Sequence, residues 1–174
     1  MKFFNFLPIF FLSAYTYSCS DLLDTEIRVL DSSETVNLCE YTNHVVLVVN
    51  VASRCGYTYQ YSSLQKLYES YKENDFVVLG VPSRDFMQEY SDEGDVAEFC
   101  STEYGVDFPM FATSKVRGQK ASPLYKKLIA KSGVSPKWNF NKYLISREGE
   151  VVSTYGSSVK PDSIELISNI EELL

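Results

Sequence analysis

Residues 45–58 read VVLVVNVASRCGYT, an apolar run that passes into a polar turn containing a cysteine. The β-branched half, Val45–Val51, predicts a buried strand. Apolar and aromatic residues at helical spacing follow the turn and predict a helix over about residues 59–72. Cys55 is therefore expected between strand and helix, where free N–H groups and the positive end of the helix dipole favour an anion. A thiol in such a place tends toward the thiolate, which is the nucleophilic form.

These residues alone leave two interpretations of Cys55. A free cysteine is commonly a small, inert, buried residue. The position between strand and helix favours a reactive thiol instead, and this is the interpretation we adopt.

A second continuous apolar run, Asp75–Pro82, predicts a strand covered on both faces, as in a parallel sheet. With the first strand and its helix it forms a strand–helix–strand crossover. Earlier in the chain, Glu26–Val29 and Thr35–Leu38 flank polar turn residues and predict an N-terminal β-hairpin.

The second half of the chain predicts further short strands and helices. The helices are expected over residues 94–104, 122–131 and 163–174, and the strands over 108–111, 142–146 and 150–155. An apolar stripe on the last helix is expected to face the core: Ile164, Ile167, Ile170 and Leu174. This order of elements predicts an α/β, thioredoxin-like fold, in which helices flank a central mixed sheet preceded by the hairpin.

Composition limits the classes of function. The 174 residues suit one domain, and a net charge of −7 makes the chain a poor general binder of nucleic acid. Four cysteines and one histidine include no Cys-x-x-Cys or His-x-x-x-His pair, so we expect no metal site. A copper-delivery protein would also need a histidine close to its cysteines, and His44 is expected at the surface.

The first residues predict a targeting segment. Lys2 precedes an apolar run, which is typical of a signal peptide over residues 1–18, with a mature domain over 19–174. Cleavage would release an exported protein, periplasmic in a bacterium. Alternatively, Cys19 is the lipid-modified first residue of a membrane-anchored lipoprotein, or the leader remains as an uncleaved anchor. The residues before Cys19 form a poor lipobox.

Three other places carry chemical groups of interest. Cys100 lies on a predicted helix and either packs as an apolar residue or forms a disulfide with an oxidised Cys55. Trp138 and Asn139 offer N–H donors for an anion, although a lone tryptophan is commonly a core residue. Gln88 lies in a polar loop, where glutamine is usually solvent-exposed.

Several segments together resemble the glutathione peroxidase family in its cysteine form. They are NVASRCGYT (50–58), LGVP (79–82), FCSTEYGVDFP (99–109), KWNFNKYLI (137–145) and KPDSIE (160–165). The resemblance implies a thiol peroxidase that reduces hydrogen peroxide and organic hydroperoxides in the response to oxidative stress. It further implies an active-site tetrad of Cys55, Gln88, Trp138 and Asn139, with Cys100 as the resolving cysteine. Thioredoxin or glutathione would be the reducing co-substrate, and no cofactor is expected.

The chain departs from the family pattern around Gln88. It has one residue fewer between Phe86 and Gln88, and the Pro-Gly that usually follows the Gln-Glu pair is replaced. Ser83 stands where relatives often carry a cysteine. The segment between Phe111 and Trp138 lacks the insertion of tetrameric relatives, so a monomer is expected.

Charge is unevenly distributed along the chain. Between Phe108 and Arg147 there are nine basic residues and no acidic residue. This segment is either an ordinary solvated surface or a docking face for an anionic reductant or a lipid headgroup.

Two other functions compete with peroxidase turnover. A thioredoxin-type oxidoreductase is disfavoured because the chain has no Cys-x-x-Cys motif. A peroxide-sensing thiol protein, which passes its oxidation to a partner without turnover, keeps some support from the altered loop before Gln88.

Overall fold

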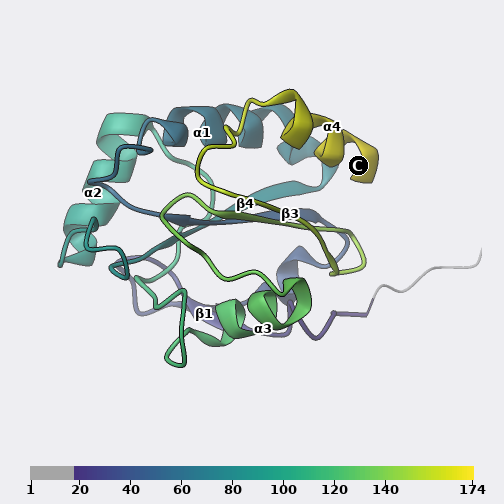
Figure 1. Cartoon of the computed structure of the whole chain (residues 1–174), viewed down its shortest axis with the longest axis horizontal. Helices are drawn as coiled ribbons and strands as arrows, with labels where there is room; N and C mark the ends of the chain where they lie inside the picture. The colour runs from purple at the N-terminus through teal and green to yellow at the C-terminus, as the bar shows by residue number, and fades with distance from the viewer. Residues whose placement is uncertain (1–17) are drawn as a thin grey trace, which may run out of the picture.

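The computed structural model describes residues 18–174, so the expected leader lies outside the described residues except for Ser18 (Figure 1). An antiparallel hairpin of β1 (Glu26–Arg28) and β2 (Thr35–Asn37) comes first. A separate four-stranded sheet follows, with the strand order β4-β3-β5-β6.

The central pair of this sheet consists of β3 (Val45–Val51) and β4 (Phe76–Pro82). The two strands are parallel, and every residue in both is buried, as their continuous apolar sequences predict. On the other side of β3, β5 (Lys142–Ile145) runs antiparallel to it, and β6 (Val151–Tyr155) runs antiparallel to β5. The expected mixed sheet with its N-terminal hairpin is confirmed.

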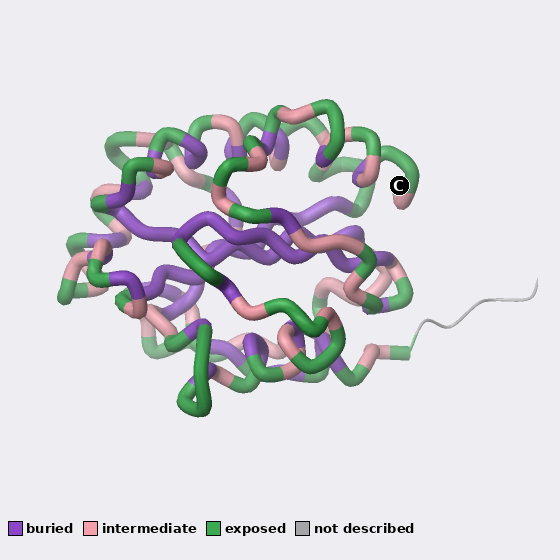
Figure 2. The backbone as a smooth tube through the Cα atoms, in the orientation of Figure 1, coloured by how far each residue is buried: buried purple, intermediate pink, exposed green. Residues whose placement is uncertain are grey.

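Helices cover both faces of the sheet, and the buried residues concentrate in the central strands (Figures 1 and 2). On one face, α1 (Gln60–Tyr71) and α4 (Ile164–Leu173) pack against the odd-numbered residues of β3. On the other face, α3 (Pro123–Ser132) packs against the even-numbered residues. The helix α2 (Glu93–Tyr104) stands at one end of the molecule and contributes Val96 and Cys100 to the first core. Two short 3-10 helices, Leu38–Tyr41 and Lys72–Asn74, lie in the connections.

Two sequence expectations were wrong in detail. Residues 108–111 do not form a strand; they make two isolated bridges, Met110 to Gly80 and Phe111 to Val29, because the segment passes from the edge strand β4 to the end of β1 after one pairing with each. On α4, Leu166 and Ile170 are buried and the expected Ile167 and Leu174 pack partly buried against the same core, whereas Ile164 is 85% exposed at the start of the helix. Ile164 is the first residue of the helix and lies beyond the core, whereas Leu166 in the same turn is buried.

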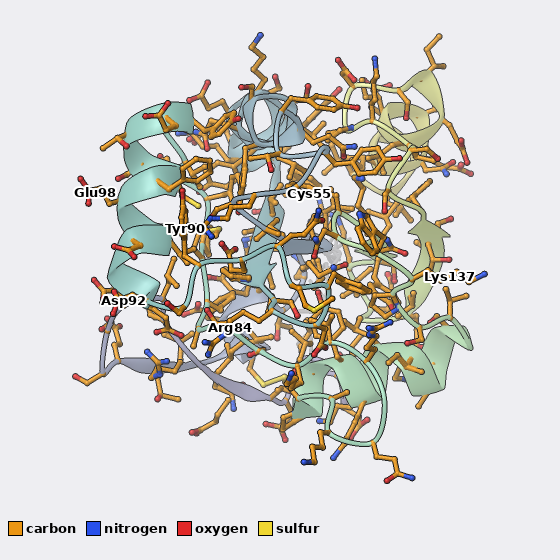
Figure 3. The ribbon with its side chains drawn as sticks, turned by 60° about the vertical axis from the view of Figure 1, so that its left-hand side comes forward. Cys55, Arg84, Tyr90, Asp92, Glu98 and Lys137 are labelled. Atoms are coloured by element: carbon orange, nitrogen blue, oxygen red, sulfur yellow. A yellow bond between two sulfur atoms is a disulfide. The ribbon has the colours of Figure 1, made fainter. Side chains whose placement is uncertain are left out.

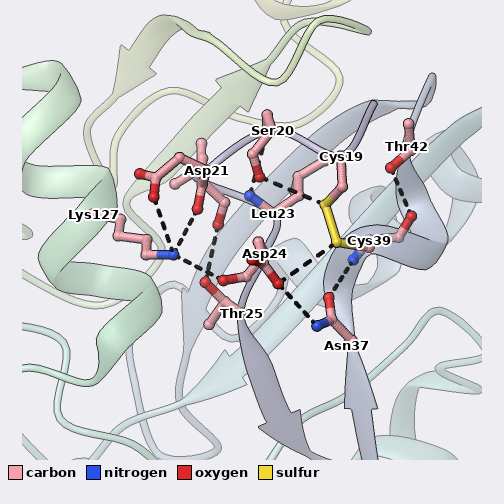
Figure 4. Close-up of a disulfide and its surroundings, with 11 residues drawn as sticks. Cys19, Ser20, Asp21, Leu23, Asp24, Thr25, Asn37, Cys39, Thr42 and Lys127 are labelled. Atoms are coloured by element: carbon pink, nitrogen blue, oxygen red, sulfur yellow. Dashed lines mark hydrogen bonds and ion pairs between the residues drawn. A yellow bond between two sulfur atoms is a disulfide. The ribbon is translucent and has the colours of Figure 1, made fainter. Parts of the chain in front are cut away.

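A disulfide between Cys19 and Cys39 ties the segment before the hairpin to the 3-10 helix after it (Figure 4). The pair lies 20 residues apart in the sequence, and closing a loop of that length stabilises a fold by about 3 kcal/mol in the chain-entropy model. Lys127 of α3 strengthens the same region by donating from Nζ to the Asp24 carbonyl oxygen at 2.8 Å. A Cys19 sulfur in this disulfide cannot also carry a thioether-linked lipid, so the lipoprotein expectation and this pairing exclude each other.

Candidate active site

The loop between β3 and α1 holds Cys55, as its position in the sequence predicts. The thiol is largely buried, and the backbone N–H of Tyr57 donates to Sγ at 3.4 Å. Thr58 fixes the turn from the other side: its Oγ1 accepts from the Cys55 N–H at 3.0 Å and lies 3.0 Å from the Ala52 carbonyl oxygen. The turn therefore presents a backbone donor to the sulfur and holds it in one place.

The loop after β4 is hydrogen-bonded to the Cys55 turn. Arg54 N donates to the Gln88 carbonyl oxygen at 2.9 Å, and Ser53 N donates to Glu89 Oε1 at 3.1 Å. Met87 adopts a left-handed backbone conformation, with φ of 57°, and its side chain is 93% exposed. This tight bend lets the shortened loop turn outward at Met87 and inward at Gln88.

Gln88 and Asn139 meet in this loop junction. Asn139 Nδ2 donates to Gln88 Oε1 at 3.0 Å, which leaves the Gln88 amide nitrogen directed away from that contact. Asn139 is fully buried, and its Oδ1 has no hydrogen-bond partner among the described residues. The Gln88 side chain therefore contacts Asn139, although the loop before it is one residue shorter than the family pattern.

Trp138 lies at the surface of the same site. Its side chain is 40% exposed and packs on Phe86, with ring centroids 5.3 Å apart. The Trp138 carbonyl oxygen accepts from Asn50 Nδ2 at 3.0 Å and from Asn141 Nδ2 at 2.9 Å, so the backbone here is fixed to β3.

The structure thus collects the expected tetrad only in part. Within residues 18–174, no hydrogen bond joins Cys55 Sγ to Gln88, Trp138 or Asn139. The loops that carry Gln88 and Asn139 are bonded to one another, and the Gln88 loop is bonded to the Cys55 turn. Such an arrangement can stabilise a thiolate and an oxygen that gains negative charge.

Cys100 lies on α2 in a buried position, and both it and Cys55 are free thiols. Burial raises the pKa of Cys100 to about 11, the neighbouring Tyr61 hydroxyl opposes this rise, and the Glu89 carboxylate adds to it. At neutral pH this thiol is therefore protonated and shielded from solvent.

Sequence reasoning missed two buried ionisable residues near the site. Glu89 Oε1, which accepts from Ser53 N of the Cys55 turn, also accepts from the backbone N–H of Tyr90 at 2.9 Å. Burial raises the pKa of the Glu89 carboxyl. Lys142 is fully buried at the start of β5, and its Nζ donates to the Phe140 carbonyl oxygen at 2.8 Å. Burial lowers the pKa of Lys142 to about 7. A lysine within an apolar strand was the only available signal for the second residue.

The basic segment is partly neutralised by acids from elsewhere in the chain. Four of its nine basic side chains form ion pairs with carboxylates: Lys115 with Asp85, Lys127 with Asp21, Lys131 with Glu150, and Arg147 with Asp75. The segment is therefore only in part a free cationic face. Lys137, next to Trp138, remains exposed (Figure 3).

Three or more His, Cys, Asp or Glu side chains gather nowhere in residues 18–174 as a metal-ligand set. None of the helices in this part of the chain is both long and apolar enough to cross a membrane.

Comparison with known proteins identifies the family to which this chain belongs. The glutathione peroxidase family model matches residues 22–129. The chain belongs to the glutathione peroxidase family. The glutathione peroxidase homolog BsaA of Halalkalibacterium halodurans is 47% identical over 152 residues, which are 84% of this chain and 95% of that protein. The hydroperoxy fatty acid reductase gpx1 of a Synechocystis species is 44% identical and covers 84% of this chain and 92% of its own length.

The solved structures agree with this assignment. The crystal structure of Trgpx in its apo form matches with a TM-score of 0.71 at 33% identity, over 88% of this chain and 95% of that one. The thioredoxin-like fold is therefore shared with this solved structure.

Replacing Lys142 by Met should change how stability depends on pH. The folded chain holds this amine with a pKa of about 7, against an ordinary value of 10.5, so between these pH values the unfolded chain binds a proton that the folded chain does not. Wild-type free energy of unfolding should therefore gain up to about 1.4 kcal/mol per pH unit in this window from Lys142 alone. Lys142→Met should lack this gain.

Urea unfolding at a series of pH values between about 7 and 10 measures the effect. Lys126→Met is the matched control, because Lys126 is exposed on α3, and it should keep the wild-type slope. Equal slopes for wild type and Lys142→Met would contradict the assignment.

Proposed function

We propose that this member of the glutathione peroxidase family is a thiol peroxidase that reduces hydrogen peroxide and organic hydroperoxides through Cys55. The observation that carries the proposal is the junction of three loops at the Cys55 turn, where Arg54 N bonds the Gln88 carbonyl and Asn139 bonds the Gln88 side chain. A reactive thiol and fixed amide donors come together there in a family of peroxidases.

In the first step the Cys55 thiolate attacks one peroxide oxygen, and the O–O bond breaks. Cys55 is oxidised to a sulfenic acid, and the other oxygen leaves with the bonding electrons and takes up a proton, which gives water or an alcohol. The amide of Gln88 and the N–H groups of Trp138 and Asn139 donate to the thiolate and to the departing oxygen. Asn139 Nδ2 donates to the side-chain oxygen Oε1 of Gln88, so the side-chain N–H groups of Gln88 remain available for this task.

In the second step Cys100 resolves the sulfenic acid. Its sulfur bonds to Cys55 Sγ, and the hydroxyl group leaves with the thiol proton as water. A thioredoxin-like dithiol then reduces the disulfide; without this step, two glutathione molecules would return Cys55 to the thiol. Because Cys100 is buried on a helix, the second step requires α2 to open locally.

Fatty-acid hydroperoxides fit the exposed side of the site. Met87 and Trp138 both present apolar surface next to the residues proposed to react, and a relative is named a hydroperoxy fatty acid reductase. An acyl chain lying on this surface would bring its hydroperoxide group toward Cys55. Because this surface and that relative both favour hydroperoxide reduction, we also expect a role in the response to oxidative stress.

A peroxide sensor is the second candidate. It is favoured by one observation, the lack of any hydrogen bond from the Gln88, Trp138 or Asn139 side chains to Cys55 Sγ within residues 18–174. An enzyme turns over peroxide while reductant lasts, whereas a sensor consumes about one equivalent and stops.

Replacing Cys55 and Cys100 separately should distinguish the oxidation of Cys55 from its resolution by Cys100. Cys55→Ser should abolish peroxide consumption with every reductant, because no sulfenic acid forms. Cys100→Ser should lose turnover with thioredoxin and keep it with glutathione, because only the intramolecular disulfide needs Cys100. Steady-state assays with both reductants in parallel measure this. Full activity of Cys55→Ser would refute the peroxidase proposal, and full thioredoxin activity of Cys100→Ser would refute the resolving role.

Removing the amide pair should slow the first step. We expect Gln88→Ala and Asn139→Ala each to lower the rate constant for Cys55 oxidation by about ten- to a hundredfold. The double variant should lose little more, because the two side chains are bonded and act together. Stopped-flow oxidation by hydrogen peroxide measures the rates, with Lys126→Ala, at an exposed position on α3, as the unchanged control. Wild-type rates in both single variants would remove these amides from the mechanism.

We further propose that the protein is exported, periplasmic in a bacterium, and a monomer. The Cys19–Cys39 disulfide supports export, because disulfides persist in oxidising compartments. Intact-mass measurement of the exported protein before and after reduction distinguishes the two fates of Cys19. Uptake of two hydrogens on reduction is expected, whereas the mass of attached acyl chains would show the membrane-anchored lipoprotein instead.

A further inference from the structure

A chain of ring contacts connects the Cys55 turn to helix α2. The Arg54 guanidinium lies 4.3 Å from the centroid of the Tyr90 ring. Tyr90 in turn packs edge-on against Phe99, with centroids 5.9 Å apart, and Phe99 contacts Tyr104 at 5.6 Å. In Figure 3, Tyr90 lies beside α2 on the side toward Cys55.

The ends of this stack adjoin the two free thiols. Arg54 immediately precedes Cys55, and Phe99 immediately precedes Cys100. Tyr90 is half-buried between them and stands where the family pattern departs after its Gln-Glu pair. The contact therefore couples the turn that carries one thiol to the helix that carries the other.

Besides this stack, α2 is held by a limited apolar contact: Ala97 and Tyr104 are partly buried against the first core, and the Tyr104 ring lies 5.4 Å from that of Tyr61. Of its twelve residues only Val96 and Cys100 are buried. Five acidic residues lie on the helix or at its N-cap, with no basic residue among them: Asp92, Glu93, Asp95, Glu98 and Glu103. Glu98 and Glu103 lie beyond the N-terminal turn, so the helix dipole does not stabilise their negative charge. The described ion pairs include one from this helix, Glu93 with Arg28.

We propose that Tyr90 is a positioning residue: its ring contacts with Phe99 and Arg54 hold α2 in its closed position. These contacts thereby set how fast Cys100 reaches an oxidised Cys55. The proposal rests on the resolving role of Cys100 in the proposed function. The affected step is the one in which the Cys100 sulfur bonds to Cys55 Sγ and the sulfenic hydroxyl leaves with the thiol proton as water. While α2 stays closed, the sulfenic acid can instead react with a second peroxide to give sulfinic acid.

The size of the effect follows from the two contacts. A cation–π contact and an aromatic pair together shift an equilibrium by about tenfold. Replacing Tyr90 by Ala should therefore increase the population of open α2 by about tenfold. Tyr90→Phe keeps the ring, and since no hydrogen bond from the Tyr90 hydroxyl is found within residues 18–174, it should behave as wild type.

The first test needs no peroxidase activity. In a Cys55→Ser background, alkylation of Cys100 by N-ethylmaleimide reports how often α2 opens. Tyr90→Ala should react about tenfold faster than its parent, and Tyr90→Phe should match the parent. Arg54→Gln should accelerate alkylation too, with a less than additive effect beside Tyr90→Ala, because both remove the same contact. An unchanged rate of Cys100 alkylation in Tyr90→Ala, or an equal increase of that rate in Tyr90→Phe, would contradict the proposed positioning role of Tyr90.

The second test follows resolution with both thiols present. After one equivalent of hydrogen peroxide, Tyr90→Ala should form the Cys55–Cys100 disulfide about tenfold faster and give less sulfinic acid at high peroxide. The rate of Cys55 oxidation itself should not change. Faster alkylation together with an unchanged rate of disulfide formation would overturn the proposed control of resolution. Faster alkylation with no disulfide in either protein would support the positioning role of Tyr90 and refute the resolving role of Cys100. Failure of the Tyr90 proposal and failure of the Cys100 proposal are therefore distinguishable.

Discussion

Parallel pairing of β3 with β4 is the constraint on which the site depends. Val51 pairs with Pro82, so the two strands end at the same edge of the sheet. The Cys55 turn and the loop carrying Gln88 leave from this edge side by side, and Arg54 N and Ser53 N bond them together. Because β5 runs antiparallel to β3, the residues just before β5 reach the same edge, where Phe140 N donates to the Asn50 carbonyl oxygen. Three distant segments thus meet as a consequence of strand direction.

Burial then decides the chemical state of the groups gathered there. The pKa of Cys100 rises, the pKa of Lys142 falls, and the pKa of Glu89 rises, each chiefly because the charged form loses its water. The site therefore combines a thiol in a turn with a backbone donor on its sulfur and a second thiol kept protonated within a helix. Both thiols are buried, but these different surroundings would suit the tasks proposed for them, immediate attack by Cys55 and delayed attack by Cys100.

Sequence reasoning reached most of the fold and part of the site. Fully apolar runs identified β3 and β4, and the spacing that follows Cys55 identified α1, because strand and helix periods differ clearly there. Ile164 was misplaced because periodicity shows a stripe but not where the core ends. Residue patterns left Gln88 and Asn139 ambiguous, and only family resemblance pointed to them. Their contact depends on the left-handed bend at Met87, a backbone feature without a sequence signal in a non-glycine residue. Tyr90 and Glu89 were missed because their roles depend on distant partners.

The burial of Cys100 sets two requirements against each other. A resolving thiol must reach the sulfenic acid quickly, yet an exposed thiolate in an oxidising compartment would itself be oxidised. Keeping Cys100 in a helix and protonated protects it, and the cost is the free energy of opening α2. Only two of the twelve residues of α2 are buried, and Glu93 alone among its acidic residues is in a described ion pair, so we expect that free energy to be small. The stack on Tyr90 then adds a modest, local contribution from the Cys55 turn itself, so that the turn in which the sulfenic acid forms also helps to hold its partner closed.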